Sequence, residues 1–214
     1  MGKNLLKYTQ APPFSLADRT WPNTQLTKAP IWCSVDLRDG NQALVNPMTL
    51  KQKIEFFNYL VEIGFKHIEI GFPAASSIEF EFTRHIIEQN LIPDDVYIQV
   101  LTQSREPLIQ RTLQAIEGAK NAIVHLYNST STAQRNYVFN KSKEEVIDIA
   151  LSGVELIKKY ITPQHNTILL EYSPESFTGT EIDFSLQICN AVIDNWSISS
   201  PIIINLPATV ELFM

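Results

Sequence analysis

Six short apolar segments alternate with five segments whose apolar residues recur at helical spacing, and this alternation restricts the fold more than any other feature of the chain. The expected strands are 31–36, 67–72, 96–102, 121–127, 167–173 and 201–207, and the expected helices are 48–64, 76–90, 107–119, 142–161 and 181–196. The strands are continuously apolar, which is typical of a parallel sheet covered on both faces. The repeat length of roughly 30 to 40 residues is that of βαβ units.

Local signals support the helix boundaries. Ser142 and Glu145 form the pattern of a capping box, and Ser76 or Ser77 can cap the second helix. Gly64 follows the first helical segment and predicts its end.

Two architectures fit this pattern, an open doubly wound sheet and a (β/α)₈ TIM-type barrel. The first strand is not followed by GxGxxG, which disfavours the dinucleotide-binding version. A barrel needs eight strands and typically ~250 residues, so six strands in 214 residues predict an incomplete barrel. Residues 11–30 contain four prolines. We therefore predict an N-terminal extension at 1–30 and a partial barrel domain at 31–214.

Composition limits the partners. The net charge is −6 without a basic stripe, so no nucleic acid partner is expected. No apolar stretch reaches the ~20 residues of a membrane span, so no membrane partner is expected either. Cys33 and Cys189 both lie in apolar runs. We expect two buried thiols and a reducing, cytoplasmic location.

Polar side chains gather where the predicted strands end, which is where active sites of parallel α/β folds lie. After the first strand come Asp36, Arg38 and Asp39, in DLRDGNQ. A carboxylate there can ligate a divalent metal, and an arginine can stabilise a developing oxyanion. The alternative interpretation is an ordinary charged turn, because Asp–Gly–Asn is also typical of a bend without a function.

Alternation places further polar residues on inward strand faces. His125 and Tyr127 alternate with apolar residues, so both point into the barrel, although a lone strand histidine is often a satisfied core group. Glu171, Ser173 and Glu175 alternate in the same way, and Glu175 follows Pro174 in what we expect to be a loop facing a pocket. The alternative for Glu175 is an ordinary surface carboxylate.

After the sixth strand, Asn205 and Thr209 flank LeuProAla and are candidate pocket residues or turn formers. His67 and His85 are expected to be structural or solvated, and His165 to lie in a loop. No GxSxG motif or P-loop occurs, and Cys33 lies within a strand, so a reactive thiol is not expected.

The motifs together resemble the long form of 2-isopropylmalate synthase. They are, in order, DLRDGNQALVNPM, GFKHIEIGFPAASSIEFEF, VHLYNSTSTAQR, LEYSPESFTGTE and PIIINLPATVE. The lead-in PPFSLADRTWPN is similar to the N-terminal extension of that form, and the resemblance runs from about Tyr8 to Glu211. RDGxQ alone would indicate only the wider family of homocitrate synthase, citramalate synthase and hydroxymethylglutaryl-CoA lyase.

The resemblance implies a (β/α)₈ barrel that condenses acetyl-CoA with 2-oxoisovalerate (3-methyl-2-oxobutanoate) to 2-isopropylmalate in leucine biosynthesis. It implies a divalent cation (Mg²⁺, Mn²⁺ or Zn²⁺) that chelates the oxo acid, and it allows a monovalent cation such as K⁺. The full-length family member is expected to be a cytoplasmic homodimer.

The resemblance also implies roles for individual residues. Asp39 would be a metal ligand, Arg38 would stabilise the negative oxygen formed during attack, and Glu175 would lie near the isopropyl group as a second catalytic residue. The implied substrate-binding residues are His125, Tyr127, Ser173, Asn205 and Thr209.

The sequence departs from the family in one respect that affects activity. The HxH motif that supplies two further metal ligands does not occur. The last strands, the subdomains that help to bind CoA and the C-terminal leucine-regulatory domain are expected to be absent. We therefore expect the chain alone to be inactive, with open sheet edges that favour self-association. The alternatives are a related synthase of the citramalate or homocitrate type, or a non-catalytic module that binds an oxo acid.

Overall fold

A computed structural model describes residues 28–162, 167–196 and 200–210. Contacts divide the chain after Ile31, and the fold described below is that of the second unit, from Trp32 onward. The predicted extension at 1–30 lies almost wholly outside the described residues, as does His165.

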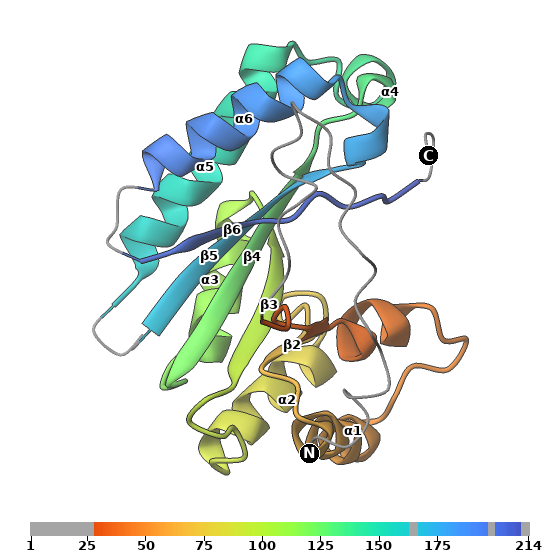
Figure 1. The fold of residues 1–214 in the computed structure, drawn as a ribbon, viewed down its shortest axis with the longest axis vertical. Helices are drawn as coiled ribbons and strands as arrows, with labels where there is room; N and C mark the ends of the chain where they lie inside the picture. Colours follow the sequence, from red (N-terminus) through yellow and green to blue (C-terminus); the bar gives the residue numbers. More distant parts are fainter. Residues whose placement is uncertain (1–27, 163–166, 197–199, 211–214) are drawn as a thin grey trace, which may run out of the picture. The chain divides into compact units, whose positions relative to one another are not determined.

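The described part of the second unit contains one sheet of six parallel strands in the order β1-β2-β3-β4-β5-β6 (Figure 1). The strands are β1 Cys33–Ser34, β2 His67–Gly71, β3 Tyr97–Gln103, β4 Asn121–Ser129, β5 Thr167–Glu175 and β6 Ile202–Ile204. A doubly wound sheet would reverse its strand order at a switch point. The strictly sequential order confirms the incomplete TIM-type barrel.

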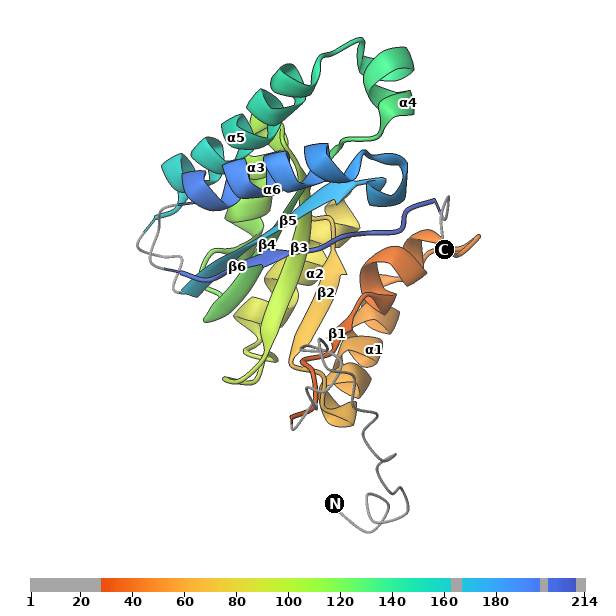
Figure 2. The same ribbon diagram turned by 45° about the horizontal axis from the view of Figure 1, so that its top comes forward.

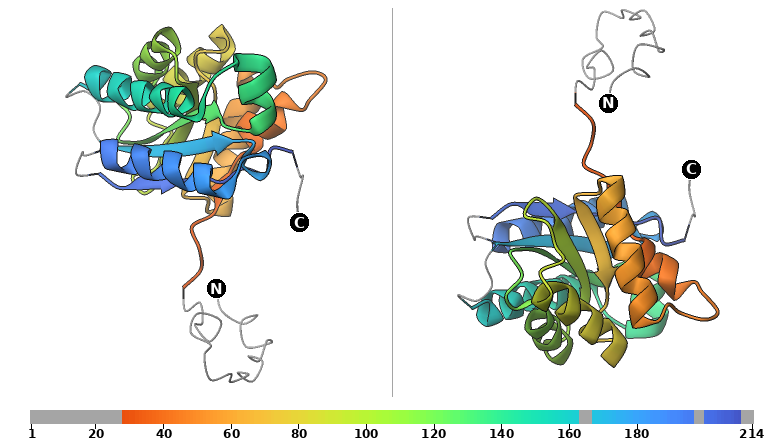
Figure 3. Two further views of the ribbon diagram at one scale, coloured as in Figure 1. Left: turned by 90° about the horizontal axis from the view of Figure 1, so that it is seen from above. Right: turned by 90° about the horizontal axis from the view of Figure 1, so that it is seen from below.

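Helices follow the strands in turn. The main helices are α1 Leu50–Ile63, α2 Ser77–Glu88, α3 Glu106–Ile116, α5 Lys143–Tyr160 and α6 Ile182–Asn195. Consecutive helices of this series pack against one another, and Figures 2 and 3 show them following one another around the outside of the strands. Short helical segments follow some of the strands: η3 Asp36–Gly40, α4 Thr132–Gln134, η4 Arg135–Phe139 and η5 Phe177–Gly179.

The predicted helix signals are confirmed. Ser142 and Glu145 form a complete capping box at the start of α5. The hydroxyl of Ser76 accepts a hydrogen bond from the backbone N–H of Glu79 at the start of α2. Gly64 ends α1 with a φ of 108°, a left-handed conformation that glycine adopts without strain.

Three expectations about the sheet edges are wrong. The first strand covers only Cys33–Ser34, because the backbone turns at Val35, whose carbonyl accepts hydrogen bonds from the N–H groups of three residues of η3. The last strand shortens to Ile202–Ile204. Cys33 is exposed, not buried, because β1 lies at the edge of the described sheet, where β2 is its one neighbour. Cys189 is buried as expected.

The core between the sheet and the helices is apolar. It includes Ile68 and Ile70 of β2, Phe57 of α1, Phe82 of α2 and Val124 of β4, all wholly buried. This packing fixes the strands, and the strands fix the side chains on their inner face. None of the helices in the described parts of the chain combines the length and apolar character that a bilayer crossing requires.

Candidate active site at the carboxyl ends of the strands

A pocket of about 520 Å³ opens at the carboxyl ends of the strands. Its lining residues are Arg38, Asp39, Gln42, Phe72, Leu101, His125, Tyr127, Ser173, Glu175, Asn205, Pro207, Ala208 and Thr209. All eight residues to which the resemblance assigns a role line this one cavity. They come from η3, β4, β5 and the segment after β6.

Strand register explains why these residues converge. His125 of β4 pairs with Leu101 of β3 and Glu171 of β5, and Tyr127 pairs with Ser173. Residues in register on parallel strands point to the same face, so they form layers across the sheet. The inward direction expected for His125 and Tyr127 is thus confirmed.

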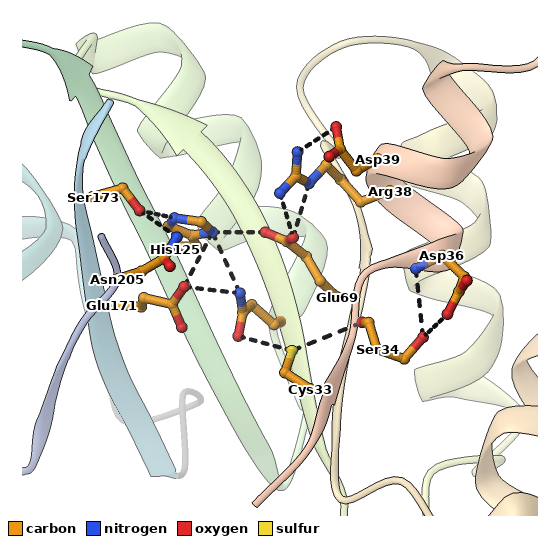
Figure 4. A network of polar contacts seen from close by, with 11 residues as sticks. Cys33, Ser34, Asp36, Arg38, Asp39, Glu69, His125, Glu171, Ser173 and Asn205 are labelled. Carbon is orange, nitrogen blue, oxygen red and sulfur yellow. Dashed lines mark hydrogen bonds and ion pairs between the residues drawn. The ribbon is translucent and has the colours of Figure 1, made fainter. Parts of the chain in front are cut away.

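The turn after β1 carries the charged wall of the pocket. The Nε and Nη2 atoms of Arg38 both lie 2.8 Å from Oε2 of Glu69, and its Nη1 lies 2.9 Å from Oδ1 of Asp39 (Figure 4). Asp36 instead accepts a hydrogen bond of 2.6 Å from the hydroxyl of Ser34 and does not line the pocket. The DLRDG segment is therefore a helical turn that aims two of its three charged side chains into the cavity.

Glu69 is wholly buried on β2. Burial alone raises the pKa of a carboxyl group, but the hydrogen bond from His125 and the charge of Arg38 outweigh it and lower the pKa of Glu69. Glu69 is therefore an anion that anchors Arg38.

A chain of hydrogen bonds crosses the pocket floor from β2 to the segment after β6 (Figure 4). His125 contacts Oε1 of Glu69 through Nδ1 and Oγ of Ser173 through Nε2, each at 2.7 Å. Asn205 donates from Nδ2 to Oγ of Ser173 at 2.8 Å. His125 is 3% exposed, so its ring has no freedom to turn toward solvent.

Beneath this chain lies a second polar layer. Gln99 of β3 donates from Nε2 to Oε1 of Glu171 at 3.2 Å, and that oxygen lies 3.5 Å from Nδ1 of His125. Burial raises the pKa of Glu171. The Sγ of Cys33 points at Oε1 of Gln99. Burial of this sulfur, with the charges of Glu69 and Glu171, raises the thiol pKa to about 12. Although Cys33 has exposed surface, it is almost entirely in the unreactive thiol form at neutral pH, as expected for a cysteine that takes no part in chemistry.

Tyr127 is held as a neutral phenol. Gln103 donates from Nε2 to its hydroxyl at 2.7 Å, and burial raises the pKa of Tyr127. The hydroxyl is thus a fixed polar group on the pocket wall.

Glu175 lines the pocket from the end of β5, and Thr209 lines it from the segment after β6. The expectation that Glu175 belongs to a loop is wrong, since it is the last residue of β5 and pairs in register with Ser129, whose hydroxyl donates to its carboxylate. The hydroxyl of Thr209 accepts a hydrogen bond of 3.0 Å from the backbone N–H of Ser176. This bond ties the segment after β6 to the end of β5.

The described residues do not by themselves make a metal site. Asp39 is the candidate ligand, and its side chain is 64% exposed at the pocket edge. Among the described residues no group of three or more His, Cys, Asp or Glu side chains could hold an ion. One carboxylate would leave most of a cation's ligands to water or substrate.

Sequence reasoning missed Glu69 and Gln99, although both lie on inward faces where the alternation rule would have found them. It also missed the ion pair of Lys53 with Glu79 between α1 and α2, which no local pattern indicates. Oε2 of Glu79 accepts a hydrogen bond of 3.3 Å from the backbone N–H of Phe72, so this ion pair helps to hold a pocket residue in place.

His67 begins β2 and packs edge-on against Tyr97, and neither it nor His85 lines the pocket.

Parallel strands in sequential order, with a polar pocket at their carboxyl ends, define a TIM-barrel-type α/β fold. A family model described as HMGL-like matches residues 29–214. The chain belongs to the HMGL-like family.

Curated relatives are similar over nearly the whole chain. A 2-isopropylmalate synthase from Acetoanaerobium sticklandii is 58% identical over 98% of this chain, and one from Clostridium acetobutylicum is 56% identical over 96%. The resemblance expected from the motifs is thus confirmed. The chain spans only 37% and 38% of the lengths of these two relatives.

Solved structures agree with the fold. An HMG-CoA lyase from Bacillus subtilis is 17% identical with a TM-score of 0.58, covering 82% of this chain and 57% of that chain. An HMG-CoA lyase from Acinetobacter baumannii, in complex with coenzyme A and 3-methylmalate, is 17% identical with a TM-score of 0.59, covering 85% and 57%.

Proposed function

We propose that this chain is the N-terminal part of the catalytic domain of a 2-isopropylmalate synthase, within residues 31–214, and that its pocket binds 2-oxoisovalerate for condensation with acetyl-CoA. The observation that carries the proposal is the meeting of eight motif residues in one cavity. The identity of 52% to 59% to curated 2-isopropylmalate synthases supports it.

Arg38 is suited to the step in which charge develops. When the enolate of acetyl-CoA attacks the ketone carbon, the ketone oxygen becomes negative and needs a fixed positive partner. Two bonds to the buried Glu69 fix the guanidinium, so it does not have to reorganise during the reaction. Because Glu69 binds Nε and Nη2 of Arg38, the third nitrogen, Nη1, points to Asp39 at the pocket edge.

The remaining walls suit a branched oxo acid. The second N–H of the Asn205 amide and the hydroxyl hydrogen of Thr209 can orient the carboxylate and ketone oxygens. Phe72 and Leu101 offer apolar surface for an isopropyl group. Glu175 lines the same pocket, where we propose that it contributes to substrate choice.

Enzymes of the HMGL-like family use a divalent metal ion. We propose that the complete enzyme uses Mg²⁺, Mn²⁺ or Zn²⁺, with Asp39 supplying one carboxylate, and that the ion would polarise the ketone as a Lewis acid. We also propose a cytoplasmic homodimer for the full-length protein, as the resemblance implies. Because the chain lacks an HxH pair, we expect it to bind the oxo acid without turnover.

Calorimetric titration of the 214-residue chain tests the proposal. In the presence of Mn²⁺ we expect 2-oxoisovalerate to bind more tightly than pyruvate or 2-oxoglutarate. Arg38→Ala should weaken binding by at least about tenfold, because an oriented charge is lost. Arg111→Ala, on the exposed side of α3, is the matched control and should bind normally.

Other outcomes point elsewhere. Tighter binding of pyruvate or 2-oxoglutarate would assign the chain to a related synthase. Absence of binding to all three acids would remove the proposal. Thiol release from acetyl-CoA by the chain alone would show that the HxH motif is dispensable.

A further inference from the structure

The imidazole of His125 lies between two carboxyl groups on one side and a hydroxyl on the other (Figure 4). Nδ1 lies 2.7 Å from Oε1 of Glu69 and 3.5 Å from Oε1 of Glu171. Nε2 faces Oγ of Ser173. The two ring nitrogens thus meet chemically different surroundings, which favours one tautomer.

The partners of Glu69 determine the direction of the first hydrogen bond. Glu69 is an anion bound by Arg38, so its oxygens only accept, and the bond to His125 requires a proton on Nδ1. In a neutral ring, Nε2 is then an acceptor.

The rest of the chain follows from that choice. Ser173 donates its hydroxyl hydrogen to Nε2 of His125, and its oxygen accepts the hydrogen bond from Asn205. Every donor in the chain therefore points from Asn205 toward Glu69.

Gln99 could reverse this order. Its Nε2 lies 3.3 Å from Nδ1 of His125, and an N–H directed at Nδ1 would make that nitrogen an acceptor and move the ring proton to Nε2. Glu171 opposes this in two ways. It accepts the hydrogen bond from Gln99 at 3.2 Å, and it places a second carboxyl oxygen on the Nδ1 side of the ring.

We propose that Glu171 is a positioning residue that, together with Glu69, keeps the His125 proton on Nδ1 and so sets the direction of the hydrogen bonds through Ser173 to Asn205. Glu171 does not line the pocket and acts only through His125. The consequence for an oxo acid rests on the proposed function: with Nε2 engaged by Ser173, the pocket presents the Asn205 amide in one orientation.

The tautomer can be observed directly. Long-range proton–nitrogen correlation spectra of the chain labelled with ¹⁵N-histidine distinguish the protonated ring nitrogen of each of the four histidines. The His125→Asn variant assigns the His125 signals. At pH 8 we expect the Nδ1–H form to predominate at His125.

Glu171→Gln keeps the shape of the side chain and removes its charge. The ratio of the Nδ1–H to the Nε2–H form should fall about tenfold, because a charge at 3.5 Å from Nδ1 favours a proton there. Glu62→Gln, on the exposed side of α1, is the matched control and should leave the ratio unchanged. Circular dichroism checks that the variants are folded.

A predominant Nε2–H form in the unaltered chain would overturn the proposal without any variant. An unchanged ratio in folded Glu171→Gln would also overturn it. If that variant does not fold, Glu171→Asp, which withdraws the carboxylate, should give a smaller fall, and no fall would count against the proposal. The spectra need no substrate, so failure of oxo-acid binding and failure of this inference are separate results.

Discussion

Arg38 binds the buried carboxylate of Glu69 through two nitrogens, each 2.8 Å from the same oxygen, although the residues are 31 positions apart. Glu69 shares its other oxygen with His125. One buried anion thus fixes two pocket side chains, one from η3 and one from β4.

Glu69→Gln should therefore affect both stability and binding. Arg38 would lose its buried counter-charge, keeping only the exposed Asp39, and His125 would lose its anionic acceptor. We expect the free energy of unfolding to fall by about 3 kcal/mol, as for other broken buried ion pairs. Urea unfolding measures this change. Glu62→Gln should leave the midpoint unchanged, and an equal midpoint for Glu69→Gln would show that the pair adds no stability.

Gly71→Ala tests the support behind β2. A Cβ at Gly71 would collide with Oε2 of Glu79, which is held by the buried Lys53. Moving Glu79 would leave the ammonium group unpaired, so we expect a loss of about 3 kcal/mol or more in urea unfolding.

Gly64→Ala is the control for that variant. No atom lies within 4 Å of the added Cβ, but φ is 108°, so only backbone strain of about 1 kcal/mol is expected. Equal losses in the two variants would mean that backbone conformation, and not the ion pair, makes Gly71 necessary.

The inward-facing residues could be predicted from the sequence because strand alternation is local. His125, Tyr127 and Ser173 follow from a period of two, and the same rule would have given Glu69, which lies between Ile68 and Ile70. The sequential strand order was also predictable as one of two architectures. Consecutive strands of βαβ units tend to lie side by side, and their connections share one handedness.

Burial at the edges and pairing between helices could not be predicted. Cys33 and Cys189 both lie in apolar runs of the sequence. Burial, however, depends on the number of neighbouring strands, and among the described strands β1 has one neighbour. Lys53 reads as a solvent-facing helix residue, and its partner lies 26 residues away on another helix. Such a contact depends on helix packing, which a single sequence does not encode locally.

Glu181 predicts a defined acid dependence. Hydrogen bonds from Arg135 are the main reason that the pKa of Glu181 falls from 4.5 to about 2. A depressed carboxyl pKa adds stability that is complete above about 4.5 and is lost as the pH falls toward 2. Because the side chain is 43% exposed, solvent screening reduces the contribution to about 1 kcal/mol.

The measurement is the difference in unfolding free energy between the unaltered chain and Glu181→Gln, at pH 6 and at pH 3. We expect the difference to shrink at the lower pH. Glu88→Gln removes an exposed helix pair with Arg84 and should give less than about 0.5 kcal/mol at either pH. A difference for Glu181 that grows on acidification would contradict the assigned direction of its pKa.

Asp39→Asn separates metal binding from folding. The Asp39 side chain is 64% exposed, and its one ion pair among the described residues is with Arg38. The free energy of unfolding should therefore change by less than about 1 kcal/mol. If Asp39 contributes a ligand to a divalent cation, the unaltered chain should bind 2-oxoisovalerate more tightly with Mn²⁺ than with a chelator, and Asp39→Asn should abolish that difference. Asp148→Asn, on the exposed side of α5, should retain it. A metal effect that persists in Asp39→Asn would assign the ion to other ligands, since one neutral amide oxygen binds Mn²⁺ much more weakly than a carboxylate.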